Sequence, residues 1–282
     1  MKLTDIEIRD PFIVTENGKY YLMGSTGDDP WERGSDFSLF VSDDLVEFEF
    51  VKTLVEPSVF EGYTQFWAPE LHKYNDKFYI IVSVFCPEKG RGSVILVSDK
   101  IDGTYKFLTG EYITPNGWTC LDATLFVYKD KPYLCFSNEW VHTITGDGDG
   151  SLFMVELSDD LTKTVGYPRK IVSGKYSGIS IEMETPDKMG TGWVCEGPYL
   201  LTENGKIVLY WSTYTDKGYC ILRSVADDIF GKYVFDKYVY LNDGGHSMVF
   251  TDYKGDKKII FHQPNTTPDE RAFIYDLGEL LK

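Results

Sequence analysis

The sequence predicts an all-β protein, a five-bladed β-propeller with four-stranded blades. A short pattern, a turn leading into an apolar strand, recurs five times along the 282 residues. Each copy is followed by a polar turn and a second apolar run, and successive copies start 58, 54, 74 and 50 residues apart. That spacing suits propeller blades and no helical repeat. The copies open at Asp10, Ala68, Asp122, Glu196 and His246.

Within a repeat, short runs rich in Val, Ile, Tyr and Phe are joined by turn residues such as Asn17-Gly18, which is typical of β-hairpins. The first repeat contains four such runs, over residues 10–15, 20–25, 37–44 and 48–53. The fourth repeat has the same order, over residues 197–202, 207–213, 218–228 and 232–237. A β-sandwich is the alternative architecture, but it does not predict similar starts at regular intervals. We therefore expect one propeller domain over residues 1–282.

The innermost strand of each blade lines the central channel of a propeller, so the starts of these strands meet at one mouth. Asp10, Asp122, Glu196 and His246 are expected at equivalent starts, although they are far apart in sequence. Carboxylates crowded at a dry mouth oppose one another's ionisation, and one proton tends to be retained. A general acid and a general base need such a separation of pKa values. We therefore predict that the three acids are catalytic.

Composition narrows the range of partners. The formal net charge is −16, from 44 acidic and 28 basic residues, which argues against nucleic acid and anionic membranes. No apolar run approaches the length of a membrane span, and the first ten residues contain no apolar signal-like stretch. Five cysteines without a CxxC pair predict reduced thiols. These observations favour a cytoplasmic protein with an oligosaccharide substrate, and they leave the oligomeric state open.

The motifs around the acids resemble glycoside hydrolase family 43 over essentially the whole chain. The resemblance rests on Arg9-Asp10-Pro11-Phe12-Ile13, Trp67-Ala68-Pro69-Glu70, Leu121-Asp122-Ala123, Cys195-Glu196-Gly197-Pro198-Tyr199 and Gly244-Gly245-His246-Ser247-Met248, with His262 and Pro264-Asn265. It implies a five-bladed propeller that hydrolyses arabinofuranosides or xylosides with inversion.

The resemblance also implies a role for each motif residue. Asp10 is expected as the general base, Glu196 as the general acid, and Asp122 as the group that tunes and orients that acid. His246 matches a position near a central ion, usually calcium, so calcium on the propeller axis is the cofactor that the resemblance implies. For inversion, the carboxyl groups of base and acid should lie roughly 6.5–9.5 Å apart to admit a water molecule.

Other candidates come from position alone. The aromatic rings of Phe66, Trp67 and Trp118 lie near the predicted mouth and are candidate sugar platforms, with packing inside a blade as the alternative. Arg223 and Arg271 are candidate partners of substrate hydroxyls, with ion pairing between or on the blades as the alternative. His72 and His142 have no partner pattern and are expected to be ordinary packed or exposed histidines. Residues 146–150 (GDGDG) are expected to be a flexible hairpin tip, since the downstream Glu of a calcium loop is missing.

We thus expect an inverting, exo-acting α-L-arabinofuranosidase, with a β-xylosidase as the second candidate. Exo action is inferred from location, because a cytoplasmic enzyme meets imported oligosaccharides. A retaining fructan-cleaving propeller is disfavoured, since its Asn-Asp-Pro-Asn start is absent. A phosphorylase would need a basic phosphate pocket. The alternative outside enzymes is a carbohydrate-binding propeller without turnover.

Overall fold

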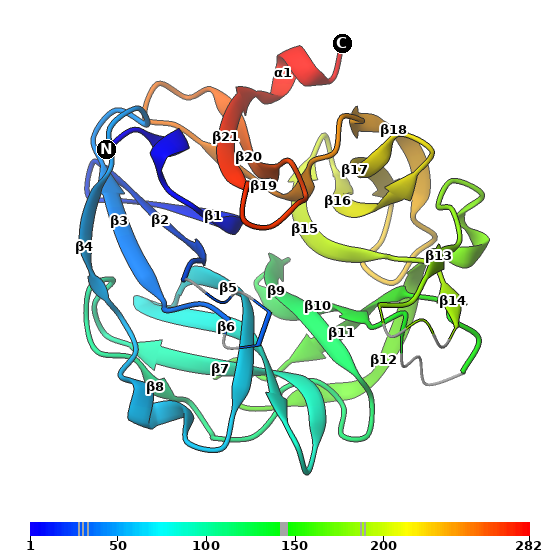
Figure 1. Ribbon diagram of the computed structural model, residues 1–282, viewed down its shortest axis with the longest axis horizontal. Coiled ribbons are helices and arrows are strands. Elements are labelled where there is room, and N and C mark those ends of the chain that lie inside the picture. The colour runs from blue at the N-terminus through cyan, green and yellow to red at the C-terminus, as the bar shows by residue number, and fades with distance from the viewer. Residues whose placement is uncertain (28, 30, 33, 142–145, 187, 189) are drawn as a thin grey trace.

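Five small antiparallel sheets surround a central axis in the computed structural model (Figure 1), which describes residues 1–282 apart from 28, 30, 33, 142–145, 187 and 189. Blade 1 contains β1 (Arg9–Glu16), β2 (Lys19–Ser25), β3 (Ser38–Ser42) and β4 (Glu49–Thr53). Blade 2 contains β5 (Thr64–Tyr74), β6 (Lys77–Cys86), β7 (Gly90–Ser98) and β8 (Lys106–Phe107). Blade 3 contains β9 (Cys120–Tyr128), β10 (Lys131–Asn138), β11 (Ser151–Leu157) and β12 (Thr164–Ser173).

Blade 4 contains β15 (Glu196–Glu203), β16 (Lys206–Thr215), β17 (Gly218–Ala226) and β18 (Val234–Tyr240). Blade 5 contains β19 (Gly245–Thr251), β20 (Lys257–Gln263) and β21 (Arg271–Asp276). The first strand of each blade lies nearest the axis in Figure 1. The predicted five-bladed propeller is therefore confirmed.

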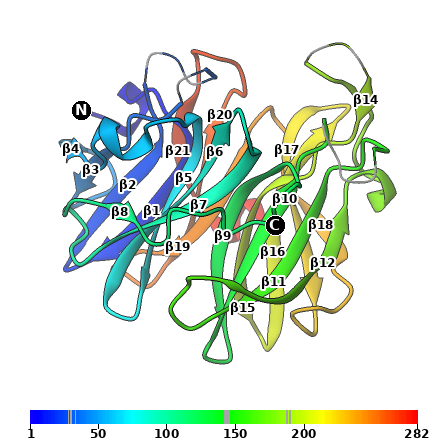
Figure 2. The same cartoon turned by 90° about the horizontal axis from the view of Figure 1, so that it is seen from below.

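The remaining elements are short. Three 3-10 helices cover Leu3–Asp5, Pro57–Phe60 and Lys175–Ser177, and helix α1 (Leu277–Leu280) follows the last strand. The hairpin of β13 (Met183–Glu184) and β14 (Thr191–Gly192) lies between blades 3 and 4 and projects at one end of the molecule (Figure 2). None of the helices among the described residues has the length and apolarity that crossing a membrane requires.

Blade 5 gains its outer edge from the other end of the chain. Its three strands are extended by a bridge between Glu7, just before β1, and Arg271 of β21, and the Ile8 N–H points to the Glu270 carbonyl oxygen at 3.5 Å. The fourth strand position of this blade is thus taken by the segment that precedes blade 1. This contact joins the last blade to the first and closes the ring.

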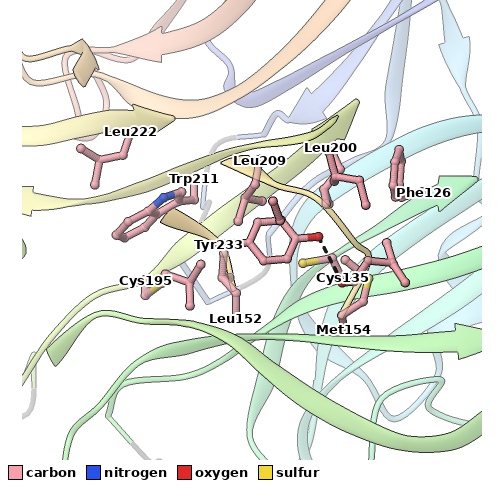
Figure 3. Close-up of a cluster of buried hydrophobic side chains, with 14 of the residues drawn as sticks. Phe126, Cys135, Leu152, Met154, Cys195, Leu200, Leu209, Trp211, Leu222 and Tyr233 are labelled. Carbon is pink, nitrogen blue, oxygen red and sulfur yellow. Dashed lines mark hydrogen bonds between the residues drawn. The ribbon is translucent and has the colours of Figure 1, made fainter. Parts of the chain in front are cut away.

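The core consists of five apolar clusters, one between each pair of neighbouring blades. Alternate residues of β10 show why: Tyr133 and Cys135 pack toward blade 4, whereas Leu134 and Phe136 pack toward blade 2. Figure 3 shows the cluster between blades 3 and 4, in which Trp211 is 1% exposed. Because both faces of the second strands are covered, these strands are continuous apolar runs in the sequence.

The hairpins between the first two strands of blades 1–4 have the predicted turns. Both central residues have positive φ in each, for example 50° and 80° at Asn17 and Gly18, and 50° and 76° at Asn204 and Gly205. Two-residue turns of this kind match the right-handed twist of the flanking strands. Each turn fixes the residue at which the innermost strand ends. Because that strand runs along the channel, its start then lies at the opposite mouth.

Candidate active site

One mouth of the channel opens into a pocket of about 510 Å³ that all five blades line. Asp10, Trp67, Asp122, Glu196 and His246 each come from a different blade, in that order. The structure thus brings the three predicted catalytic carboxyls together at one end of the channel. The other end of the channel holds a separate cavity of about 520 Å³.

The innermost strands begin with a shared backbone distortion. One residue near each start has φ between 46° and 56°, and a register shift follows it in the pairing with the second strand. Such a bulge turns a side chain out of the regular alternation and is frequent beside active sites. The residues with this conformation are Asp10, Ala68, Asp122, Gly197 and His246.

The predicted equivalence of Glu196 is therefore corrected by one residue. Glu196 pairs with Ser212 of β16, just as Arg9 pairs with Ser25 in blade 1. Gly197, and not Glu196, occupies the position of Asp10. The residues with positive φ form one ring of equivalent positions around the channel. A second ring lies one residue earlier in each strand, and its members are Arg9, Trp67, Leu121, Glu196 and Gly245.

A repeated hydrogen bond ties each of these strand starts to the preceding blade. The hydroxyl of Ser25 accepts the N–H of Ala68 at 2.9 Å, and that of Ser83 accepts the N–H of Asp122 at 2.9 Å. Ser212 likewise accepts the N–H of His246 at 2.8 Å. These bonds satisfy backbone donors that the bulges withdraw from the sheets.

Two of the contacts between neighbouring blades depart from this pattern, and both involve predicted catalytic residues. Between blades 5 and 1 a histidine replaces the serine, and His262 Nδ1 accepts the N–H of Asp10 at 3.1 Å. Between blades 3 and 4 the Gly197 N–H donates to Oδ2 of Asp122 at 3.0 Å, while the hydroxyl of Ser137 donates to the Cys195 carbonyl. The backbone beside Glu196 is thus held by another carboxyl group of the site.

His246 lies between two of the carboxyls. Its Nδ1 is 3.1 Å from Oδ1 of Asp10 and 3.8 Å from Oδ2 of Asp122. Burial alone lowers the pKa of His246, but the two aspartates raise it to about 10, so the imidazole is protonated at neutral pH. Burial alone raises the pKa of Asp10, but the charge and hydrogen bond of His246, with Arg9 and His262, bring that pKa well below its usual range. Asp10 is therefore ionised.

The other two acids shift in the opposite direction. Burial, together with the nearby charges of Glu196 and Asp10, raises the pKa of Asp122 to about 7 against the opposing effect of His246. Burial is also the main cause of the raised pKa of Glu196, which a hydrogen bond from Tyr219 and the charge of His246 partly offset. Two carboxyl groups with raised pKa values and one with a lowered pKa therefore share the pocket.

Arg9 and Asn265 form the wall between blades 1 and 5. The guanidinium of Arg9 binds Glu270 and, at 2.8 Å, the side-chain oxygen of Asn265. That oxygen also lies 3.1 Å from Nε2 of His262, so His262 carries its proton on Nε2 and leaves Nδ1 free to accept from Asp10. Burial and the charge of Arg9 lower the pKa of His262 to about 3 and keep it neutral.

Trp67 lines the opposite wall with one face covered. The Arg91 guanidinium lies 3.5 Å from the centroid of its ring, and the indole N–H donates to the Trp31 carbonyl at 3.2 Å. Arg91 also binds Gln65 and lies 3.8 Å from Glu139, both of which line the pocket. Trp67 remains a candidate sugar platform through its other face.

The other predicted substrate contacts lie elsewhere. Phe66 packs on Phe37 between blades 1 and 2, and Trp118 packs on Phe136 and Phe153 of blade 3. Arg223 binds Glu203 and Asp236 within blade 4, and Arg271 binds the carbonyl oxygens of Pro268 and Glu270. None of the four is among the described residues that line the pocket. The four side chains thus make the packing and polar contacts that were named as the alternatives to sugar binding.

The histidines and the GDGDG run have ordinary structural settings where they are described. His72 is buried against Glu70 at 2.8 Å, and His142 lies outside the described residues. Asp149 is 1% exposed, and its carboxylate accepts bonds from Ser173, Lys170 and the Lys175 N–H. This end of the run is therefore a fixed anchor and not a flexible tip.

No group of three or more His, Cys, Asp or Glu side chains suited to a metal ion occurs in the part of the chain that the structure describes. The Nδ1 of His246 faces two carboxyl groups, so this nitrogen carries a proton there. Calcium near His246 stays a prediction, and no step below depends on it.

Several pocket residues were not predicted from the sequence: Arg9, Trp31, Glu139, Trp140, Tyr214 and, behind the pocket, Tyr219. Arg9 and Asn265 lie inside the motifs around the predicted site, so their place in these motifs could have identified them as pocket residues. Tyr219 follows a turn at the start of a third strand, and nothing in its local sequence marks it.

The comparisons with known proteins agree with this geometry. The sequence profile of glycosyl hydrolases family 43 matches residues 4–278. The chain belongs to glycosyl hydrolases family 43. The extracellular exo-α-(1→5)-L-arabinofuranosidase of Streptomyces chartreusis is 31% identical over an alignment of 173 residues, and the match covers 57% of this chain and 47% of that protein. The extracellular endo-α-(1→5)-L-arabinanase 2 of Bacillus subtilis (strain 168) is 24% identical over an alignment of 225 residues, and the match covers 70% of this chain and 42% of that protein.

A solved structure matches this family 43 chain over nearly its whole length. The endo-arabinase from Bacteroides thetaiotaomicron VPI-5482 superposes with a TM-score of 0.88 at 29% identity, covering 98% of this chain and 96% of that one. By contrast, the chain spans less than half the length of the two curated relatives. The expected cytoplasmic location is wrong, because both of these relatives are named extracellular enzymes. The composition of the first residues was a poor guide to location. The expectation of exo action was inferred from a cytoplasmic location and therefore loses its basis.

Proposed function

We propose that this family 43 protein hydrolyses α-L-arabinofuranosyl linkages with inversion of configuration. The observation that carries the proposal is the pocket in which an ionised Asp10 shares one mouth with Asp122 and Glu196, whose pKa values are raised. An inverting glycosidase needs one carboxylate and one carboxylic acid at the same bond. The arabinofuranosyl preference is supported by the names of the two curated relatives and of the Bacteroides structure.

In the proposed reaction Asp10 removes a proton from water as the water oxygen bonds to the anomeric carbon. Glu196 delivers its proton to the glycosidic oxygen as the bond between that oxygen and the anomeric carbon breaks. The products are a pentose of inverted configuration and an alcohol end on the leaving chain. His246 keeps Asp10 ionised before the reaction, and burial together with the charge of Asp10 raises the pKa of Glu196 and so favours its protonated form.

Asp122 has the role of a tuning group in this proposal. Its Oδ2 accepts the N–H of Gly197, directly after the proposed acid, and its side chain is only 7% exposed. It can therefore orient the backbone of Glu196 and change the electrostatic field there without contacting the reacting bond.

Activity on a panel of 4-nitrophenyl glycosides tests the substrate class. We expect the α-L-arabinofuranoside to be cleaved well above the β-D-xyloside, and Glu196→Gln and Asp10→Asn controls to exclude contaminating activity. A preference for the xyloside would overturn the arabinofuranosyl assignment, and inactivity on every glycoside and on linear α-(1→5)-arabinan together with sugar binding would favour a carbohydrate-binding propeller. Magnetic resonance of the first product formed distinguishes inversion from retention.

The position of cleavage is a separate question. The relatives include an exo-arabinofuranosidase, at 31% identity over part of the chain, and an endo-arabinase structure that covers 98% of it. We favour endo cleavage because that structure matches the whole domain. Linear α-(1→5)-arabinan should then yield a ladder of oligosaccharides early in the reaction, whereas release of arabinose alone would assign exo action.

A further inference from the structure

The carboxyl group of Glu196 is held from behind by a residue of a neighbouring strand. The hydroxyl of Tyr219, on β17, lies 2.8 Å from Oε1 of Glu196. Tyr219 is 1% exposed, and burial, with the charges of Glu196 and Asp10, raises its pKa well above the usual value, so it keeps its proton. A buried hydroxyl hydrogen requires an acceptor. Within the described residues Oε1 of Glu196 is the acceptor that it reaches.

We propose that Tyr219 is a positioning residue that decides which oxygen of Glu196 delivers the proton. An oxygen that accepts a hydrogen bond from Tyr219 is a poor place for the acidic proton, because two hydrogens would then face each other. The proton is therefore directed to Oε2, the oxygen not bound to Tyr219. This inference rests on the proposed function, in which Glu196 is the general acid.

The neighbouring blade provides space for this contact. Position 245 belongs to the ring of residues that also contains Glu196, but it is a glycine. A Cβ added to Gly245 would lie 2.1 Å from the ring of Tyr219, so any side chain there would displace the tyrosine. The ring of Tyr219 is also packed between Tyr214, at 5.1 Å, and His262, at 6.0 Å. The hydroxyl is thus held in one place by three contacts.

Tyr219→Phe tests the proposal because it removes the hydroxyl and keeps the ring. We expect kcat/KM to fall about 10- to 100-fold on arabino-oligosaccharides, whose leaving oxygen must be protonated, with the loss mainly in kcat. On 4-nitrophenyl α-L-arabinofuranoside, whose leaving group departs with little help, we expect a change of about threefold or less. Equal losses on both substrates, or none on either, would refute the positioning role.

Tyr233→Phe is the matched control. Tyr233 is also a buried tyrosine of blade 4, 8% exposed, and its hydroxyl donates to the Ile229 carbonyl at 3.2 Å inside the cluster of Figure 3. It does not line the pocket formed by the described residues. Tyr233→Phe should therefore lose a buried hydrogen bond without changing the ratio of the two activities.

A measurement independent of turnover separates this inference from the proposed function. The infrared difference spectrum between the wild type and Glu196→Gln, taken in mildly acid solution, isolates the C=O stretch of protonated Glu196. If Tyr219 donates to Oε1, that band moves to higher wavenumber in the Tyr219→Phe background. An unmoved band overturns the inference even in an inactive protein, whereas a shifted band with a wild type inactive on every glycoside overturns the proposed function alone.

Discussion

Nδ1 of His246 lies 3.1 Å from Oδ1 of Asp10, and this contact joins blade 5 to blade 1 at the centre of the pocket. The protonated imidazole lowers the pKa of Asp10, of Asp122 and of Glu196 alike. One buried cation therefore acts on all three acids: with Arg9 and His262 it outweighs burial at Asp10, whereas burial outweighs it at Asp122 and Glu196. The predictions below begin from this contact.

Replacing His246 by Asn should move both limbs of the pH profile of kcat/KM to higher pH. The cation lowers the pKa values of Asp10 and Glu196, so both values rise when it is lost. The acid limb follows ionisation of the base, and the basic limb follows loss of the proton from the acid. Initial rates between about pH 4 and 9 measure the basic limb in both proteins and show whether the acid limb enters this range in the variant. Unshifted limbs would show that the charge of His246 does not reach the acids.

Glu196→Gln should abolish protonation of the leaving group but not activation of water. We expect kcat/KM on arabino-oligosaccharides to fall by about 10²- to 10⁴-fold, with a much smaller loss on aryl glycosides. Asp10→Asn should lose both activities, since every leaving group requires the attacking water. A Glu196→Gln variant impaired equally on both substrates would remove Glu196 from the role of acid.

At the contact between blades 5 and 1, His262→Ser introduces a hydroxyl group. Ser25, Ser83 and Ser212 supply the corresponding hydroxyl between other blades. The smaller side chain leaves a cavity at a site with 0% exposure, so we expect a loss of about 2–4 kcal/mol in the free energy of unfolding at pH 7. Urea unfolding followed by tryptophan fluorescence measures this loss.

The loss in the free energy of unfolding caused by His262→Ser should be smaller at acid pH. Burial and Arg9 lower the pKa of His262 to about 3 in the folded protein, whereas an unfolded histidine titrates near 6.5. Its contribution to stability is therefore complete above pH 6.5 and is lost as the pH falls toward 3. The gap in unfolding free energy between wild type and variant should narrow from pH 7 to pH 4. A constant gap would mean that His262 is not held neutral.

Arg91→Met should weaken substrate binding more than catalysis. The guanidinium lies 3.5 Å from the centre of the Trp67 ring and binds Gln65, so its removal releases two side chains of the pocket wall. We expect KM to rise roughly tenfold with kcat little changed. Arg91→Lys, which keeps the charge, is the control. A fall in kcat at constant KM would place Arg91 in the chemical step.

The calcium expected near His246 can be tested by chelation. Treatment of the wild type with a chelator should lower its activity, and readdition of calcium should restore it. In His246→Asn the chelator should add little, because the variant lacks the histidine beside which the ion is expected to lie near Asp10. A wild type that is insensitive to the chelator would leave protonated His246 as the source of that charge.

Local features of this fold were predictable from the sequence. The turn at Asn17-Gly18 and its equivalents fixes the hairpins through positive φ, a property of the residues themselves. Strand alternation and the spacing of the repeats then give the blades. The edge of blade 5 was not predictable in this way, because it pairs Glu7 with Arg271, and no local signal reports such a contact.

The same distinction applies to the site. Asp10 and Asp122 were aligned correctly because each is the residue with positive φ in its own blade. Glu196 was placed one position late because the repeats were aligned on carboxylates. Alignment on Pro11 and Pro198 would have matched Gly197 with Asp10. The covered face of Trp67 and the contact from Tyr219 depend on packing between strands, which one sequence does not show.

The closure of the ring through the chain ends has a consequence for biosynthesis. The apolar cluster between blades 5 and 1 joins Ile6 and Ile8 to Met248, Phe250 and Ile260, across some 240 residues of chain. As the polypeptide leaves the ribosome, the side of blade 1 that faces blade 5 has no partner until the final blade has been synthesised. Assembly of the catalytic mouth, which needs His246 beside Asp10, must therefore wait until blade 5 has been synthesised, after the other four blades already exist.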